Sequence, residues 1–155
     1  MFAAIFCRRV LRVLAVCFSI SAVASLAAAQ EAEDKAGWWR FRGPNGSGVS
    51  SSTRLPVKWT VEEADWRVQL PGVGHCSPVI RGNHVFVTCG EEDSGHRQLL
   101  CLTADSGQVV WKHTIGEAKH RKHSLNSFAS STPALDAERV YVSWVDAENQ
   151  LQVKA

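Results

Sequence analysis

The chain has 155 residues, of which 45% are apolar and 21% charged, so its composition is that of a folded chain rather than a disordered one. Its net charge is only +2, without the strongly basic balance that is typical of nucleic-acid-binding proteins. We therefore expect one folded domain and no nucleic-acid partner.

The first 29 residues have the order of features of a secretory signal peptide. Three arginines precede an apolar run over 13–29, which ends in three alanines. Small residues at that point are what signal peptidase requires, so cleavage is predicted between Ala29 and Gln30. The mature chain is then expected to be exported to the periplasm, the cell surface or the extracellular medium, with no membrane span left after cleavage.

Two alternatives remain open for this N-terminal segment. A retained membrane anchor would use the same apolar run, although its length is at the short end for a membrane span. A lipoprotein signal would need a small residue before the modified cysteine, whereas Val16 precedes Cys17.

Residues 30–57 are expected to form a charged leader followed by an ordered strap. The strap, 38–56, holds three glycines, two prolines and four consecutive Ser or Thr residues, which exclude a helix or a long strand. Trp38, Trp39 and Phe41 lie among these turn residues and need apolar partners. The strap is therefore expected to pack on the folded part of the chain.

From residue 58 onward the sequence predicts short β-strands. They are expected at 66–70, 77–80, 85–89, 99–102 and 109–111, separated by glycine, proline or polar turns. No window has the sustained i, i+3, i+4, i+7 apolar spacing of a helix. Short strands with frequent turns are typical of sandwiches, barrels and propellers.

A tandem match favours one of these architectures. The stretch 77–88 matches 132–143 at a constant offset, which puts Pro133 at the place of Pro78 and Tyr141 at that of Phe86. The third strand is aligned as 100–104 with 151–155, behind a shorter loop. One unit is then four antiparallel strands, and because one such sheet cannot bury both faces, like units must stack on it. A two-sheet sandwich is the alternative, and it requires no tandem match.

The segment 100–111 resembles the pyrroloquinoline-quinone-type (PQQ-like) propeller repeat, whose usual form is roughly Ala-Leu-Asp-x-x-Thr-Gly-x-x-x-Trp. Gly107 and Trp111 match this form, Ser106 stands for its Thr, and Thr103 occupies its Asp position. Residues 39–46 resemble the mature start of secreted bacterial proteins with such repeats, and 130–134 resemble the opening of a next blade. Trp66 corresponds to Trp111 in the repeat.

The resemblance implies an all-β fold of β-propeller blades, each of four antiparallel strands, with about one and a half blades after the signal peptide. Residues 58–155 would hold these repeats, with the first blade to about residue 115, a basic loop at 116–131 and the start of a second blade at 132–155. Gly107 would allow a tight hairpin, and Trp111 would fill the gap to the next blade. The expected repeat markers are Trp66, Pro78, Gly107, Trp111 and Pro133.

For function, the resemblance implies a binding or scaffold module for a protein, a peptide or a glycan. The alternative is the N-terminal part of a PQQ-dependent quinoprotein oxidoreductase. Those enzymes resemble one another in a calcium site, a catalytic Asp and adjacent cysteines, and this sequence has no Cys-Cys pair. No catalytic residue, metal or cofactor is assigned, and PQQ and calcium are expected only under the alternative. Closing a propeller would require further blades or self-assembly.

The best candidate for a functional surface lies in the insertion between Trp111 and Pro133, because loops on one face of a propeller are where ligands bind. Three interpretations stay open: a solvated connection, an anion-binding loop, and a metal site on His120 and His123, whose spacing suits a helical turn. The candidate binding residues are Lys119, His120, Arg121, Lys122 and His123.

Three cysteines remain once the signal is removed, and an odd number cannot all pair within the chain. Cys89 and Cys101 lie on expected neighbouring strands, so a disulfide between them is one interpretation. The other is that Cys76, Cys89 and Cys101 are small apolar residues packed in a sheet. None of the three has the spacing of metal ligands.

Overall fold

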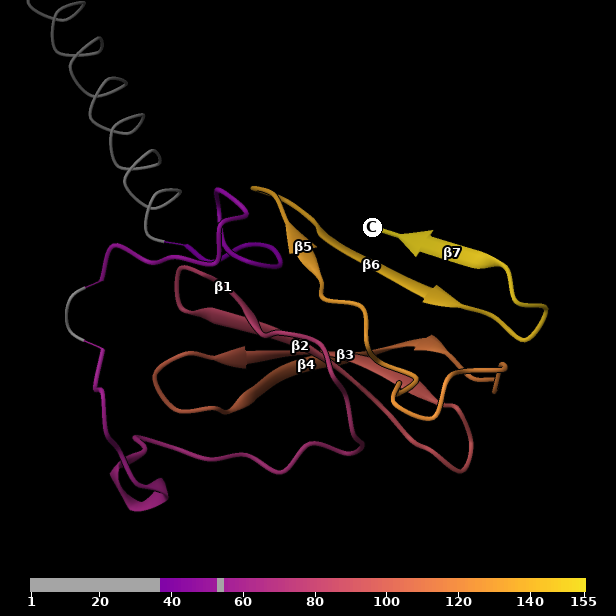
Figure 1. Ribbon diagram of the computed structural model, residues 1–155, viewed down its shortest axis with the longest axis horizontal. Coiled ribbons are helices and arrows are strands. Elements are labelled where there is room, and N and C mark those ends of the chain that lie inside the picture. Colours follow the sequence, from indigo (N-terminus) through magenta and orange to yellow (C-terminus); the bar gives the residue numbers. More distant parts are fainter. Residues whose placement is uncertain (1–36, 53–54) are drawn as a thin grey trace, which may run out of the picture. The chain divides into compact units, whose positions relative to one another are not determined.

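The computed structural model describes residues 37–52 and 55–155 (Figure 1). The predicted signal peptide, its two alternatives and most of the charged leader lie outside the described residues. In the part that is described, no helix is long and apolar enough to cross a membrane.

The fold is all-β, as the sequence predicts, and consists of two antiparallel sheets whose strands follow one another in chain order. The first sheet has four strands, β1 (Val79–Arg81), β2 (His84–Gly90), β3 (Arg97–Thr103) and β4 (Val109–Gly116). The second sheet has three, β5 (Ala134–Leu135), β6 (Val140–Val145) and β7 (Leu151–Lys154). The described helical structure is a single 3-10 turn, η1 (Val61–Glu63).

One face of the first sheet is buried by the chain that precedes β1. Side chains alternate between the two faces of a strand, so Val85, Val87 and Cys89 of β2 share this face with Leu100 and Leu102 of β3. These five side chains form one apolar cluster, against which Leu70 and Cys76 pack. The segment before β1 therefore covers this face, and it pairs with β2 through the isolated bridge between Val73 and Gly90.

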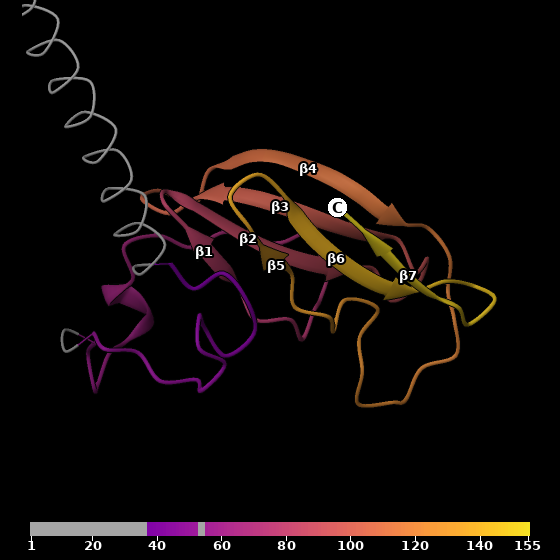
Figure 2. The ribbon, with the colours of Figure 1, turned by 90° about the horizontal axis from the view of Figure 1, so that it is seen from above.

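The other face of the first sheet is covered by the second sheet. Leu99 and Ile115 form a cluster with Val142 of β6, and Trp144 packs against it. Figure 2 shows β6 passing alongside β3, and Figure 1 agrees. Burial between two sheets is what both the stacked repeat and the two-sheet sandwich predict, because a four-stranded sheet needs a neighbour for its apolar face.

The two sheets repeat the same strand pairing. Val79 pairs with Phe86 in the first sheet, and Ala134 pairs with Tyr141 in the second, so the sequence match at 77–88 and 132–143 is also a match of register. The equivalent residues Ser77 and Thr132, which lie 55 positions apart, are joined by a hydrogen bond of 2.9 Å.

The alignment of the third strand is corrected by the register. Val87 pairs with Leu100, while its equivalent Val142 pairs with Lys154. Lys154, and not Leu151, therefore occupies the place of Leu100. Because the strands of a pair must keep their register to bury the same face, the ladder fixes this alignment better than the similarity of apolar residues does.

Trp66 joins the first sheet in a different way from that predicted. The expected strand at 66–70 is wrong, because these residues belong to no strand. The indole Nε1 of Trp66 instead donates to the carbonyl of Ala104, 2.7 Å away, at the turn between β3 and β4. Gly107 lies in this turn with φ of +67°, and a Cβ there would stand 2.3 Å from the Trp66 ring. Trp66 and Gly107, two of the expected repeat markers, are thus the two partners of one contact.

The same turn shows how the departures from the repeat pattern are accommodated. The hydroxyls of Thr103 and Ser106 lie 2.6 Å apart, and the amide of Gln108 donates to Thr103 Oγ1. A hydroxyl pair therefore joins the two positions that the repeat usually gives to Asp and Thr.

Trp111 lies within β4 rather than at its end, since that strand continues to Gly116. Its ring packs on Phe86, with centroids 5.8 Å apart, and it lines a cavity of about 270 Å³ with Val140 of the second sheet. Trp111 therefore stands at the gap between the two sheets, and 39% of it is exposed.

The strap ties the two sheets together on their β1 and β5 side. Trp38 exchanges backbone hydrogen bonds with Ile80, and the carbonyl of Trp39 accepts from the amide of Leu135. The ring of Trp38 also lies over Gly43. Phe41, by contrast, is 61% exposed, so the expectation that all three aromatic residues pack is wrong for this one.

The three described cysteines are free thiols. Cys89 pairs with Gln98 and Cys101 with Phe86, so the two cysteines lie on opposite faces of the first sheet and cannot form the disulfide considered from the sequence. Burial raises the pKa of both thiols. Cys89 and Cys101 are packed as apolar residues of the sheet, which is the other interpretation, whereas Cys76 lies before β1 and its Sγ exchanges hydrogen bonds of 3.3 Å with the backbone of Thr88.

Candidate functional site

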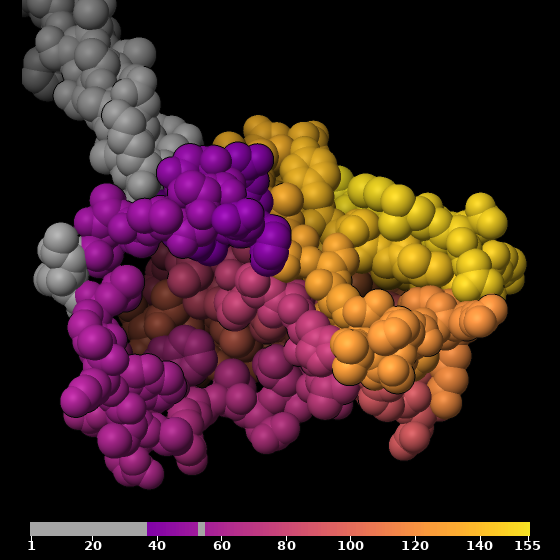
Figure 3. Space-filling model, viewed as in Figure 1, coloured from indigo at the N-terminus to yellow at the C-terminus, as the bar shows by residue number. Residues whose placement is uncertain are grey.

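Three loops meet at one end of the two sheets. They are 91–96 after β2, 117–133 after β4 and 146–150 after β6. Because β2 and β4 are both antiparallel to β3, they run in the same direction and end on the same side of the first sheet. Lys122 forms an ion pair of 2.9 Å with Glu92, which joins the first two loops. In the space-filling view the orange insertion lies beside the yellow second sheet (Figure 3).

The second half of the 117–133 insertion is bound to the first sheet. Phe128 and Ala129 are buried, and the carbonyl of Ala129 accepts from the amides of His75 and Cys76. Thr88 Oγ1 donates to the carbonyl of Ser131. The second half of the insertion is therefore part of the packed fold, and the interpretation as a solvated basic loop concerns only the residues before it.

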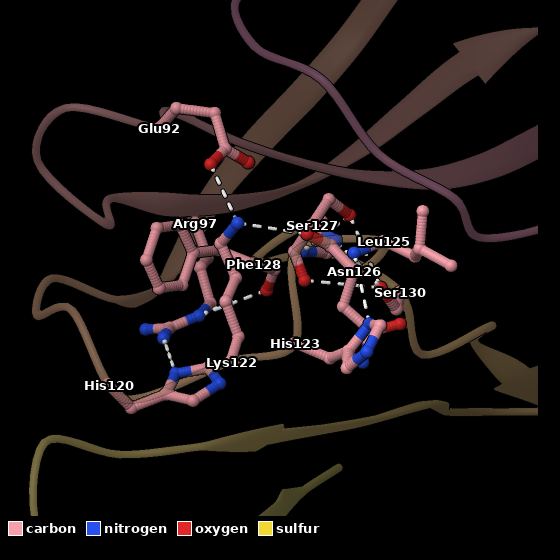
Figure 4. Close-up of polar contacts among 11 residues, drawn as sticks. Glu92, Arg97, His120, Lys122, His123, Leu125, Asn126, Ser127, Phe128 and Ser130 are labelled. Atoms are coloured by element: carbon pink, nitrogen blue, oxygen red, sulfur yellow. Dashed lines mark hydrogen bonds and ion pairs between the residues drawn. The ribbon is translucent and has the colours of Figure 1, made fainter.

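Arg97, the first residue of β3, is the buried cation of the site, and only 1% of it is exposed. Its Nε donates to the carbonyl of Phe128 over 3.0 Å, and the guanidinium lies 5.1 Å from the centre of the Phe128 ring (Figure 4). Among the described residues no carboxylate lies within ion-pair distance of it. Burial lowers the pKa of Arg97, and the more distant Asp146 opposes this effect. Its positive charge is therefore held by hydrogen-bond acceptors and an aromatic ring.

His120 is held in one protonation state by Arg97. Its Nδ1 lies 2.6 Å from Arg97 Nη2, and because a guanidinium can only donate, Nδ1 must be the acceptor. The proton of the neutral ring is then on Nε2. Burial, followed by the charges of Arg97 and Lys122, lowers the pKa of His120. The imidazole is therefore a neutral hydrogen-bond donor through Nε2.

Lys122 is the second cation beside the Phe128 ring, with Nζ 5.0 Å from its centre. Besides the ion pair with Glu92, Nζ donates to the carbonyl of Asn126 over 2.9 Å. These contacts fix a long side chain that would otherwise be mobile, so its charge has a defined position.

The predicted binding residues come together in part. His120, Arg121, Lys122 and His123 line a cavity of about 360 Å³ between the insertion and β6, whereas Lys119 is not among its lining residues. The backbone of Lys119 instead lies against Gly95, whose Cβ would stand 2.6 Å from the Lys119 nitrogen. Lys119 therefore helps to join two loops and does not face the cavity.

Sequence reasoning missed the residues that complete the cavity. Phe128 and Trp144 contribute aromatic surface, and hydroxyls come from the second half of the insertion and from β6. Arg97 was missed because, from sequence alone, a basic residue at the start of a strand cannot be distinguished from an exposed basic residue. The sequence did contain one signal of this cavity, which is Phe128, an apolar residue in a serine-rich stretch. The hydroxyls belong to Ser127, Ser130, Ser131 and Ser143.

The metal interpretation of His120 and His123 is not supported by their hydrogen bonds. Nδ1 of His120 accepts from Arg97, and Nδ1 of His123 accepts from the amide of Leu125. Within 37–52 and 55–155, no three His, Cys, Asp or Glu side chains are grouped so as to hold a metal ion. The lining residues offer donors of hydrogen bonds and positive charge, which suit an anion.

The class that fold and site define is an all-β protein of two repeated antiparallel sheets, with a cationic, hydroxyl-lined cavity at one end. Comparison with known proteins found no matching family model, no matching curated protein and no matching solved structure.

Proposed function

We propose that this chain is an exported binding or scaffold module of PQQ-like repeat type, which binds its partner at the cavity between the 117–133 insertion and β6. The observation that carries the proposal is the ordered construction of this cavity. Its cations are fixed by Phe128 and Glu92, and its wall is bound to the first sheet. A surface that loses little side-chain freedom on binding suits recognition of a ligand.

The repeat supports the structural half of the proposal. Equivalent strand pairs keep the same register in both sheets, and Trp66 packs on the turn that carries Gly107. A sheet that buries one face against a like sheet is suited to propagation along a chain of repeats. The loops after β2, β4 and β6 then form a common surface, on which binding residues can vary without a change of fold.

A binding experiment with a matched control tests this function. The full chain is screened against arrays of glycans and peptides, beside the variants Arg121→Gln and Lys112→Gln. Arg121 lines the cavity, whereas Lys112 is exposed on β4, and each change removes one positive charge. Signals that are lost with Arg121→Gln and kept with Lys112→Gln are expected. Signals insensitive to both changes would place the binding surface elsewhere.

A second experiment tests the quinoprotein alternative. The full chain is incubated with PQQ and calcium, and reduction of an electron-accepting dye is followed with alcohols and sugars as substrates. The binding-module proposal expects no reduction above that of the cofactor alone. Turnover that depends on both protein and quinone would overturn it.

Export is tested by sequencing the N-terminus of the chain recovered from the periplasm or culture medium of a bacterial host. A mature terminus at Gln30 is expected, and a chain that stays in the cytoplasm would contradict the exported location.

A further inference from the structure

The cavity at the 117–133 insertion has an excess of positive charge. Arg121 and Lys122 line it, Arg97 lies behind Phe128, and no carboxylate is among the described residues that form the lining. Glu92, 45% exposed, neutralises Lys122, 19% exposed, in part through an ion pair, and Asp146 after β6 acts as a negative charge on Arg97 and His120. Two carboxylates thus oppose three cations. Positive charge therefore remains beside the cavity, and a bound anion would be stabilised by it.

The neutral donors around this cavity suit a ligand with oxygen atoms. The hydroxyls of Ser131 and Ser143 lie 2.6 Å apart, and those of Ser127 and Ser130 lie 3.3 Å apart. A hydroxyl has one donor and two acceptor positions, so Ser131 and Ser143 keep capacity for a further partner. Ser127 and Ser130 are largely engaged by the backbone, because their hydroxyls accept from the amides of Ala129 and Ser127 and Ser130 Oγ donates to the carbonyl of Ser127. His120 adds a donor through Nε2, since Arg97 occupies Nδ1. These groups can both donate to and accept from ligand hydroxyls.

Apolar surface in the lining comes from Trp144, Val145 and Leu151, whereas Phe128 is only 7% exposed and has Arg97 and Lys122 against its ring. Aromatic and aliphatic surface beside hydroxyls and cations is complementary to a ring with C–H faces and polar substituents. The cavity volume of about 360 Å³ lies at the lower end of the range for small-molecule sites, so the ligand unit is small.

We propose that this cavity binds an acidic sugar, with the carboxylate beside Arg121 and Lys122, the ring hydroxyls on Ser131 and Ser143 and the C–H face on Trp144. The inference rests on the proposed binding function and specifies its ligand. A bare oxyanion would use the cations and the hydroxyl donors but not Trp144, and a neutral sugar would use the hydroxyls and Trp144 but not the cations, whereas an acidic sugar uses all three.

Two positioning residues support this arrangement. Arg97 fixes His120 and Phe128 through one guanidinium. Gly116 leaves room for it, because a Cβ at this position would lie 2.8 Å from Arg97 Nη1 and 3.2 Å from the indole nitrogen of Trp144. Gly116→Ala is therefore expected to displace Arg97 and Trp144 while removing no charge from the chain.

The test compares glucuronate with glucose, which differ in the carboxylate, and with inorganic phosphate. Isothermal titration calorimetry on the full chain is expected to show glucuronate binding at least about tenfold more tightly than either of the others. Arg121→Gln is expected to weaken glucuronate binding by about tenfold, and the matched control Lys112→Gln to leave it unchanged. Circular dichroism verifies that each variant is folded.

Chemical-shift mapping locates the bound probe. Glucuronate is expected to shift the amide resonances of 127–131 and 143–145, and the Gly116→Ala variant to lose this response. Equal affinity for glucose, tighter binding of phosphate, or shifts confined to other loops would each overturn the acidic-sugar proposal. Array binding that depends on Arg121 but fails with every acidic sugar would overturn the ligand class and leave the binding function standing. If the chain binds neither an array ligand through Arg121 nor an acidic sugar, both the binding function and the acidic-sugar proposal are overturned.

Discussion

Substitution of Gly107 by alanine tests the contact that joins the chain before β1 to the first sheet. The residue has φ of +67°, a conformation that costs a residue with a Cβ about 1–2 kcal/mol. The added methyl would stand 2.3 Å from Cε3 of Trp66, and overpacking of this kind costs about 1–3 kcal/mol. The expected loss of unfolding free energy is thus about 2–5 kcal/mol, a large part of the stability of about 5–15 kcal/mol of an ordinary domain.

The assay is urea unfolding followed by circular dichroism, for the wild type, Gly107→Ala, Trp66→Leu and the double variant. If Trp66 causes the clash, Gly107→Ala costs only the backbone contribution of about 1–2 kcal/mol in the Trp66→Leu background. Gly46→Ala is a further control, because Gly46 has φ of +71° but only the flexible end of Arg40 nearby. A Gly107→Ala cost that is equal in both backgrounds would refute the reasoning.

Three other predictions concern titratable groups. The Tyr141 hydroxyl and two backbone amides lower the pKa of Asp136 to about 2. The stabilising contribution of this carboxylate is therefore present above pH 3.8 and is lost as the pH falls toward 2. Asp136→Asn should flatten the acid limb of a pH–stability curve, and an unchanged limb would contradict this. The pKa of His120 lies below its usual 6.5, so the neutral ring's contribution to stability is present above pH 6.5 and is lost as the pH falls from 6.5 through the lowered pKa. The melting temperature of the wild type should therefore fall more than that of His120→Gln between neutral pH and about pH 5, and parallel curves would argue against the bond to Arg97. Cys89 and Cys101 should resist iodoacetamide until urea unfolds the chain, and rapid native labelling of either, mapped by mass spectrometry, would show that the first sheet opens.

The sequence by itself determined the class of fold and the repeat. Short β-branched runs between glycine and proline turns predict strands, since both signals act locally through backbone preference. The match of 77–88 with 132–143 predicted equivalent strand pairs, because register follows the alternation of apolar residues. The basic residues of the insertion were also visible, and four of the five proved to line one cavity: His120, Arg121, Lys122 and His123.

The tertiary structure alone decided how distant residues meet. Sequence pattern could not show that Trp66, which belongs to no strand, packs on the turn between β3 and β4. The two partners of this contact are 38 positions apart, and no periodic pattern connects them. It could not place Cys89 and Cys101 on opposite faces until the ladder fixed their partners. Nor could it find Arg97, whose burial depends on Phe128, a residue 31 positions away that returns over the end of β3. A local pattern records what each segment prefers, whereas burial and charge at the site depend on which segments the fold brings together.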